Sequence, residues 1–314
     1  MDISVVVVSW NAKAYLEQCL ESLTEAAPRR CTEIIVVDNA SSDGSADMVE
    51  AKFPRVKLIR SDENLGFAKA NNLAIEQCSG RYISLVNSDV KALPGCLDAL
   101  ADYLDHNPAV GNAGPRILNA DMSLQSSCRR FPSLWNNLCL ALGLAAAFRN
   151  SQLFSGEHMW FFPHDRALPV DVLVGCFWMI RLETLTAVGL LDEDFFIYGE
   201  DVDWCRRCWK AGWQVSFFPG GQAIHYRGAS SSNEPVRFAV LQQRSVLHYW
   251  YKHHGMPGLL GIRSLLFCHH ALRCVYDMLS RCVRSPRSAP DAGGLQVSVA
   301  CLQALLSARS PYKT

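Results

Sequence analysis

Acidic and amide side chains directly follow two short apolar runs near the start of the chain. Asp38, Asn39 and Asp43 end or follow the first run, where a carboxylate can accept hydrogen bonds from a base or a ribose. Asn87 and Asp89 end the second run and offer hard oxygen ligands, two residues apart, that suit a divalent cation. Each cluster alone is also what an ordinary turn or helix cap contains. Its significance therefore depends on what the rest of the chain places beside it.

Two further sets of residues in the second half of the chain could complete a reaction centre. Glu200, Asp201 and Asp203 crowd the first turn of a predicted helix, where the helix N-terminus stabilises negative charge. Three acids in four residues exceed what capping requires, so one of them is a candidate general base for an acceptor hydroxyl. His225 could add a nitrogen ligand, which favours Mg2+ or Mn2+ with mixed ligands, although a single histidine is more often structural.

The segment from Asn64 to Asn72 opens a predicted helix with a glycine turn, and its backbone amides could face a phosphate or a nucleoside. It contains neither GxGxxG nor GxxxxGK[ST]. Both of those motifs need their glycines for close backbone approach to phosphates, so dinucleotide-binding and P-loop chemistry are not supported.

Short β-branched runs alternate with amphipathic segments in the first half of the chain, which predicts a mainly parallel sheet flanked by helices. Residues 111–169 show no clear periodicity; a strand is predicted within Val170 to Ile180 and a helix from Glu200 to Gly212. Ligands of open α/β sheets bind beyond the carboxyl ends of the strands. The predicted strands are Ile3 to Val8, Glu33 to Asp38, Val56 to Arg60 and Tyr82 to Val86. The residues that this rule places around one cleft are Trp10, Asn11, Asp38, Asn39, Asn87 and Asp89.

The composition limits the classes of partner and the location. The chain has 314 residues, 49% of them hydrophobic, and a formal net charge of zero, so no field that would gather nucleic acid is expected. Its 13 cysteines do not follow the spacing of a secreted disulfide framework and are interpreted as reduced thiols in a cytosol. We find neither an export signal nor an uninterrupted apolar run of spanning length, and we predict a cytoplasmic protein.

The region from Gly258 to Val283 is apolar but punctuated by arginines, and it is predicted to be an amphipathic helix. On a helical wheel, one arc of roughly 80 degrees collects its basic residues, opposite an apolar arc. Two interpretations stay open: docking on anionic lipid at the inner face of the plasma membrane, or packing on the catalytic domain with the arginines solvated. The basic arc comprises Arg263, His270, Arg273, Asp277, Arg281 and Arg284, and the apolar arc Cys268, Leu272, Val275 and Leu279.

Several motifs, taken in order, resemble family 2 glycosyltransferases and, within them, bacterial rhamnosyltransferases. They are VVVSWN, VVDNASSDGS, NLGFAKANN, LVNSD, the strand from Gly175 to Arg181, and FFIYGEDVDWCRRCWKAGW. The resemblance runs from about Ile3 to Ser232 and continues more loosely through residues 251–255. No single motif is specific, but their order and spacing are.

The resemblance implies a glycosyltransferase A-type α/β fold and a role for each matched residue. Asp38 and Asp43 are expected to hold the nucleoside, while Asp89 and His225 bind the metal ion. Asp201 matches the family's presumed base and Glu200 its helper, whereas Asp203 is assigned to the helix. The family's aspartate-any-aspartate metal motif reads Asn87, Ser88, Asp89 here, so the site loses one formal negative charge. The further residues predicted to contact the nucleotide are Ser9, Asn11, Asn39, Asn64, Gly66, Asn71 and Ser88.

The resulting hypothesis is an inverting, metal-dependent enzyme that moves a sugar, rhamnose by resemblance, from a nucleotide diphosphate donor to a glycan or lipid-linked glycan acceptor. Arg227 and residues 228–233 are predicted to close over the diphosphate. Residues 1–235 are predicted to form the catalytic domain, 236–284 a helical extension and 285–314 a flexible tail.

Three alternatives to this hypothesis require other sequence features. A nucleotidyltransferase lacks support because Ser9 to Ala14 has no glycine. Processive polysaccharide synthesis lacks support because no late Gln-any-any-Arg-Trp motif is present. A catalytically silent nucleotide- or glycan-binding scaffold stays open because of Asn87.

Overall fold

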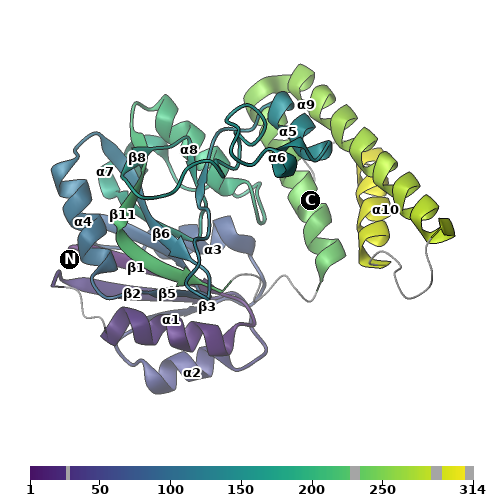
Figure 1. The fold of residues 1–314 in the computed structure, drawn as a ribbon. Helices are drawn as coiled ribbons and strands as arrows, with labels where there is room; N and C mark the ends of the chain where they lie inside the picture. Colours follow the sequence, from purple (N-terminus) through teal and green to yellow (C-terminus); the bar gives the residue numbers. More distant parts are fainter. Residues whose placement is uncertain (26–28, 227–233, 284–291, 308–314) are drawn as a thin grey trace. The chain divides into compact units, whose positions relative to one another are not determined.

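The computed structural model describes residues 1–25, 29–226, 234–283 and 292–307, which fall into two compact units (Figure 1). Unit 1 comprises Met1–Phe131, His158–Phe196 and Glu200–Ser230. Unit 2 comprises Pro132–Glu157, Ile197–Gly199 and Ser231–Thr314. The boundary predicted near residue 235 therefore lies close to one division between the units, but residues 132–157 belong to unit 2 rather than to the sheet unit.

Unit 1 is built on a nine-stranded sheet in the order β3-β2-β1-β4-β10-β6-β11-β5, with β8 paired to β11. The predicted parallel pairing is confirmed for β3, β2, β1 and β4. β10 runs antiparallel to both β4 and β6, which the sequence did not predict, so the sheet is mixed. The strands are β1 Ile3–Ser9, β2 Thr32–Asp38, β3 Lys57–Arg60, β4 Tyr82–Asn87, β5 Val90–Ala92, β6 Val110–Leu118, β8 Leu168–Pro169, β10 Phe177–Arg181 and β11 Gln214–His225. A separate two-stranded sheet pairs β7 Cys128–Arg129 with β9 Val172–Leu173.

Helices cover both faces of this sheet, because alternate side chains of its buried strands enter two different cores. Val5 and Val7 of β1 lie in one core with residues of α1, α2 and α4, whereas Val6 lies in the other with residues of α3, α7 and α8. α8 ends at Lys210 and Gly212 has φ 86°, which matches the predicted helix stop. The helices of unit 1 are α1 Lys13–Glu25, α2 Ser45–Lys52, α3 Gly66–Ile75, α4 Cys96–His106, α7 Leu182–Val188 and α8 Glu200–Lys210.

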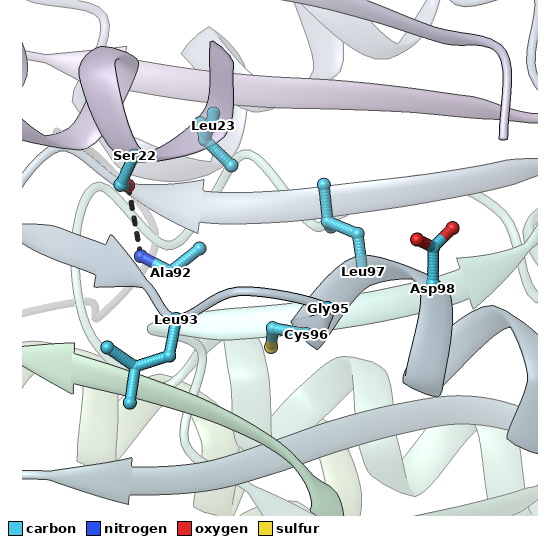
Figure 2. A pocket seen from close by; sticks show the side chains of 8 residues that line it. All are labelled: Ser22, Leu23, Ala92, Leu93, Gly95, Cys96, Leu97 and Asp98. Carbon is cyan, nitrogen blue, oxygen red and sulfur yellow. Dashed lines mark hydrogen bonds between the residues drawn. The ribbon is translucent and has the colours of Figure 1, made fainter. Parts of the chain in front are cut away.

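A small hollow lies where α1, β5 and the start of α4 meet (Figure 2). The Ala92 N–H donates a hydrogen bond to Ser22 Oγ at 3.1 Å on one side of it. Asp98, its one charged lining residue, accepts a hydrogen bond from the Arg29 N–H at 3.0 Å. None of the predicted site residues lines this hollow, so we assign it no functional role.

Unit 2 is helical, and its last helix corrects one prediction. Residues 292–307 form a helix instead of a flexible tail, because apolar residues recur at helical spacing and bury Cys301 and Leu305. The Gln243 side chain also donates a hydrogen bond to the Cys301 carbonyl at 2.9 Å. Among the described residues, no helix has the length and apolarity needed to cross a bilayer. The helices are α5 Leu134–Ala141, α6 Leu144–Ala147, α9 Pro235–Val283, interrupted at Gly255, and α10 Ala292–Ser307.

Candidate functional site

The ends of β1, β2 and β4 bring the first predicted residues together. The strand register pairs Ser9 with Asp38 and Val8 with Asn87, so these positions are neighbours at one edge of the sheet. Asp38 is buried and accepts a hydrogen bond from the Ser41 N–H through Oδ2 at 3.1 Å. Its Oδ1 and the Ser9 hydroxyl are buried and have no partner among the described residues. A buried acceptor without a donor is costly, and a hydroxyl or N–H of a bound nucleoside would satisfy it.

The amide of Asn39 ties the end of β2 to the start of α3. Asn39 Oδ1 accepts the Leu65 N–H at 2.8 Å and its Nδ2 donates to Asn64 Oδ1 at 2.9 Å. Gly66 follows with φ 78°, and a Cβ there would lie 2.4 Å from the Phe196 carbonyl oxygen. Only glycine fits that position. The contacts of Asn39, Asn64 and Gly66 therefore stabilise the loop before α3. Asn71 lies buried on α3 and donates to the carbonyl of Phe67 in its own helix at 2.8 Å.

Asn11 and Asp43 hold the loop after β1 against the loop after β2. Asn11 Oδ1 accepts the Ser42 N–H at 2.8 Å. The Asp43 carboxylate accepts the backbone N–H of Lys13, the first residue of α1, at 2.8 Å and that of Ser45, the first residue of α2, at 3.0 Å. Burial raises the pKa of Asp43, but the bonds from Ser45 and Lys13 bring it below its usual value. Both oxygens are therefore engaged within the protein, which favours a structural role over direct nucleoside contact.

The predicted metal ligands meet because β11 pairs with β5. His225 lies opposite Val90, which places its Nε2 3.3 Å from Asp89 Oδ1. The Asn87 Oδ1 is buried without a partner among the described residues, and Ser88 is buried between the two. One carboxylate, one imidazole and one orphaned amide oxygen suit a divalent ion with mixed ligands, although with one negative charge fewer than two aspartates would give.

The orientation of His225 is set by Gln125, a residue that sequence reasoning missed. Gln125 Oε1 lies 2.7 Å from His225 Nδ1, and its Nε2 donates to the His225 carbonyl at 3.0 Å. An acceptor at Nδ1 fixes the proton there and directs Nε2 toward Asp89. Burial lowers the pKa of His225, but Cys176 and Asp89 raise it to about 10, so a bound cation would have to displace a proton. No spacing or motif in the sequence links Gln125 to His225.

The carboxylates at the start of α8 differ in their partners. Asp201 accepts the Gly175 N–H at 3.1 Å and the Val202 N–H at 2.8 Å. Asp203 is fully buried and pairs with Arg207 at 2.8 Å, which agrees with its predicted structural role. Glu200 is buried, and its Oε2 has no partner in the part of the chain that the structure describes.

Both Glu200 and Asp201 hold protons more tightly than ordinary carboxyls. Burial and the charges of Asp201 and Asp203 raise the pKa of Glu200 well above its usual value. Burial also raises the pKa of Asp201, while the Gly175 and Val202 amides and the charge of Arg129 limit that rise. The pair thus has the perturbed protonation typical of catalytic carboxylates.

One short segment joins the two groups of carboxylates. The carbonyl of Cys176 accepts the Asn87 N–H at 3.0 Å, while the neighbouring Gly175 donates to Asp201. A Cβ on Gly175 would approach the Asp201 Cβ to 3.2 Å, so the backbone passes close to this side chain. The predicted base and the predicted metal ligands are therefore held by two consecutive residues before β10.

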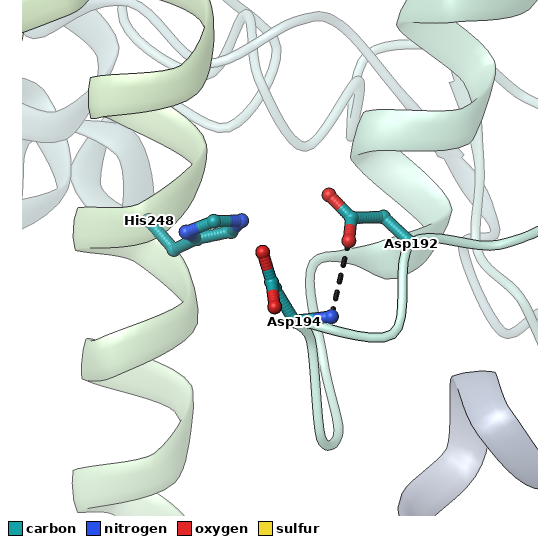
Figure 3. Close-up of side chains that lie close together, drawn as sticks. All are labelled: Asp192, Asp194 and His248. Atoms are coloured by element: carbon teal, nitrogen blue, oxygen red, sulfur yellow. Dashed lines mark hydrogen bonds between the residues drawn. The ribbon is translucent and has the colours of Figure 1, made fainter. Parts of the chain in front are cut away.

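The loop that leads into α8 is fixed by its own hydrogen bonds. The Asn72 amide donates to the Leu191 carbonyl at 2.9 Å and accepts the Leu191 N–H at 3.1 Å. In the turn that follows, the Asp194 N–H donates to the Asp192 carboxylate at 3.0 Å (Figure 3). Arg227 and residues 228–233, which were predicted to close over the donor, lie outside the described residues.

Comparison with known proteins gives matches over most of the chain. The model of glycosyl transferase family 2 matches residues 4–182, and that of glycosyl transferase family group 2 matches residues 132–304. An N-acetylglucosaminyl-diphospho-decaprenol L-rhamnosyltransferase of Mycobacterium tuberculosis is 29% identical over 292 residues, which cover 86% of this chain and 94% of the relative. A dTDP-rhamnosyl transferase of Shigella flexneri is 26% identical over 277 residues and 85% of each chain.

A solved structure supports the glycosyltransferase A-type fold. GalNAc-T7, crystallised with UDP, GalNAc and Mn2+, superposes with a TM-score of 0.60 at 16% identity. The match covers 81% of this chain and 49% of that one. At this identity the likeness concerns the fold alone.

Proposed function

Because this chain belongs to glycosyl transferase family 2 and is close to rhamnosyltransferases, we propose that it transfers a sugar, with inversion, from a nucleoside diphosphate to a hydroxyl of a lipid-linked glycan. The observation that carries this proposal is the joining of Asp201 and Asn87 by the consecutive residues Gly175 and Cys176. One short segment thus contacts both a carboxylate of raised pKa and one of the proposed metal ligands.

The reaction is a single displacement at the anomeric carbon. Asp201 accepts the proton of the acceptor hydroxyl as that oxygen bonds to the anomeric carbon, and the bond to the diphosphate breaks on the opposite face. Inversion follows from that geometry. A divalent ion held by Asp89 and His225, with Asn87 beside them, would offset the charge that develops on the departing diphosphate. Burial and the charge of Asp201 raise the pKa of Glu200, so its protonation depends on that of Asp201.

The names of two relatives support a proposal for the donor and the acceptor. The two relatives are named for the transfer of rhamnose, one from dTDP-rhamnose and one to a decaprenol-linked acceptor. We therefore propose a thymidine diphosphate rhamnose donor and a polyprenyl-linked acceptor, with the enzyme working at the inner face of the plasma membrane. The orphaned Asp38 Oδ1 is the acceptor that a nucleoside N–H or hydroxyl would meet.

The competing proposal is a catalytically silent scaffold. Asn87 favours it, because this residue stands where the family's metal motif has an aspartate. It predicts that nucleotide sugars bind without turnover. The buried Glu200 Oε2, which has no partner among the described residues, opposes it, because a binding module gains nothing from that cost.

The test is transfer and donor hydrolysis by the purified full chain against a panel of nucleotide sugars, with Mg2+, Mn2+ or a chelator. We expect turnover of one donor that requires metal and falls about 100-fold or more in Asp201→Asn, the usual contribution of a general base. Asp165→Asn, an exposed carboxylate of the same unit, is the matched control and should leave the rate unchanged. Donor binding without hydrolysis or transfer under every condition would instead establish the scaffold.

A further inference from the structure

Large apolar side chains are exposed far more often on unit 2 than on unit 1. Among the described residues, 17 of the 21 exposed large hydrophobic side chains belong to unit 2, although it is the smaller unit. Scattered exposed apolar residues are normal, but this concentration on one unit is not. The four on unit 1 are Met1, Tyr15, Met122 and Leu182.

The C-terminal half of α9 turns its polar arc inward and its apolar arc outward. Arg263 donates to the Leu305 carbonyl of α10, and Asp277 is buried. A Cβ on Gly294 of α10 would lie 3.5 Å from Arg273 Nη2 and 3.8 Å from Asp277 Oδ2. The basic arc was predicted to face lipid or solvent. Of its described residues, Arg263, Arg273 and Asp277 instead lie against α10 or are buried.

The opposite arc of α9 is the exposed one. We call Leu272, Val275, Tyr276 and Leu279 the α9 stripe; their side chains are 64%, 49%, 60% and 61% exposed. Their spacing of three, one and three residues places them on one side of the helix. A helix packed on a core would bury such a stripe, and leaving it in water forgoes the transfer free energy of four large side chains.

A second helix of unit 2 also exposes large apolar side chains. α5 packs on α9, where Leu134 lies against Gly261. Trp135 is 45% exposed and Leu142 57%. Exposed tryptophan and tyrosine beside leucine are typical of surfaces at the boundary between lipid headgroups and acyl chains.

The charge of unit 2 identifies the occupant of this surface. In sequence, unit 2 carries 11 Lys and Arg residues against 4 Asp and Glu, a net charge of +7, while the whole chain is neutral. A second copy of the chain would bring two such charges together, which opposes self-association. An anionic bilayer complements the charge and accepts the apolar stripe.

We propose that the α9 stripe inserts into the headgroup region of an anionic lipid bilayer, to which the net positive charge of unit 2 attracts it. The inference rests on the proposed function only in that a polyprenyl-linked acceptor lies in the same bilayer. The helix lies in the plane of the interface and does not cross it.

The experiment is cosedimentation of the full chain with vesicles that lack any glycan acceptor. Vesicles of phosphatidylcholine alone are compared with vesicles containing 30 to 40% phosphatidylglycerol (about one anionic lipid in three, enough to hold several basic residues near the surface). The double variant Leu272→Glu/Leu279→Glu is compared with the wild type. Leu182→Glu, which adds a carboxylate to the first turn of α7 in unit 1, is the matched control.

We expect the wild type and Leu182→Glu to bind anionic vesicles, and the double variant to bind at least about tenfold more weakly, with an unchanged far-UV circular dichroism spectrum and melting temperature. Hydrogen exchange of residues 268–280 should slow when anionic vesicles are added to the wild type, which gives a second readout if the double variant does not fold. Undiminished vesicle binding of a folded double variant, equal binding to neutral vesicles, or a wild-type dimer that the double variant disrupts would each overturn the proposal. None of these outcomes depends on transferase activity, so a failure here is distinguishable from a failure of the proposed function.

Discussion

If Asp89 and His225 bind the proposed divalent cation, Gln125 is expected to control the affinity for that cation without touching it. Its side chain makes three hydrogen bonds: Oε1 with His225 Nδ1 at 2.7 Å, and Nε2 with the His225 carbonyl at 3.0 Å and Asn119 Oδ1 at 2.8 Å. Gln125→Leu keeps the volume of this buried side chain but removes the acceptor that fixes the proton on Nδ1. The imidazole is then free to turn Nε2 away from Asp89.

The magnitude follows from the role of residues that orient metal-binding histidines. Their loss weakens metal affinity or activity by about 10- to 100-fold, which corresponds to about 1.4 to 2.8 kcal/mol. Half-maximal donor hydrolysis by Gln125→Leu should therefore need about 10- to 100-fold more Mn2+. Calorimetric titration with Mn2+ should give the same shift, because the effect lies in binding and not in the chemical step.

Asn119→Ala is the control for this prediction, since it removes the Gln125 hydrogen bond that points away from His225. The Mn2+ concentration that Asn119→Ala needs for half-maximal hydrolysis should stay within about threefold of the wild type. This is smaller than the tenfold shift, about 1.4 kcal/mol, that is the least expected for Gln125→Leu. Nucleotide binding in the presence of chelator should be the same for all three proteins. An unchanged Mn2+ affinity in a folded Gln125→Leu variant would show that Gln125 does not orient His225, and that the metal is bound elsewhere or not at all.

Two predictions concern the carboxylates at the start of α8. Burial and the neighbouring acids raise the pKa of Glu200 well above its usual 4.5. The contribution of protonated Glu200 to the free energy of unfolding is therefore complete below about pH 4.5 and is lost as the pH rises through the raised pKa. Glu200→Gln should therefore melt at a higher temperature than the wild type at pH 8 and at the same temperature at pH 4, while its transfer rate falls; a melting temperature below that of the wild type at pH 8 would contradict this. Asp203→Ala leaves Arg207 without its buried partner and should lower the free energy of unfolding in urea by about 3 kcal/mol, whereas Lys210→Ala, exposed on the same helix, should change it by less than about 0.5 kcal/mol; equal losses would refute a structural role for the Asp203–Arg207 pair.

The parts of the fold that the sequence predicted are those with a regular pattern. Runs such as Ile3 to Ser9 are β-branched and buried on both sides, and the helices between them carry one apolar stripe, so each element is visible from its own residues. β6 is different, because its nine residues include Asn112, Pro115 and Arg116. It forms only because β10 and β11 pair with it from later in the chain. Such long-range pairing leaves no local period to detect.

The site shows the same division between local and distant information. Asp38 and Asp89 were predicted correctly to lie at strand ends, because strands and turns are local features. The approach of His225 to Asp89 depends on a strand pairing between distant segments, so the sequence offered His225 only as a possible ligand, without any local pattern that joins it to Asp89. Gln125 could not be predicted at all, since its bonds to His225 span 100 residues and a glutamine has no distinctive pattern. The nucleoside contact of Asp43 stays a prediction, because in sequence a carboxylate that holds a loop and one that binds a ligand are the same residue type.

The three acids at the start of α8 show why residue type alone does not assign a role. In sequence they are equivalent, and the helix N-terminus favours all of them. In the structure, Asp203 meets Arg207, Asp201 meets two backbone amides, and Glu200 Oε2 meets no donor among the described residues. A buried carboxylate paired with a cation stabilises the fold, whereas one whose pKa burial raises costs stability and persists where function requires it. Catalysis is therefore expected at Asp201 and Glu200, whose protonation is perturbed, and structure at Asp203, whose charge is neutralised.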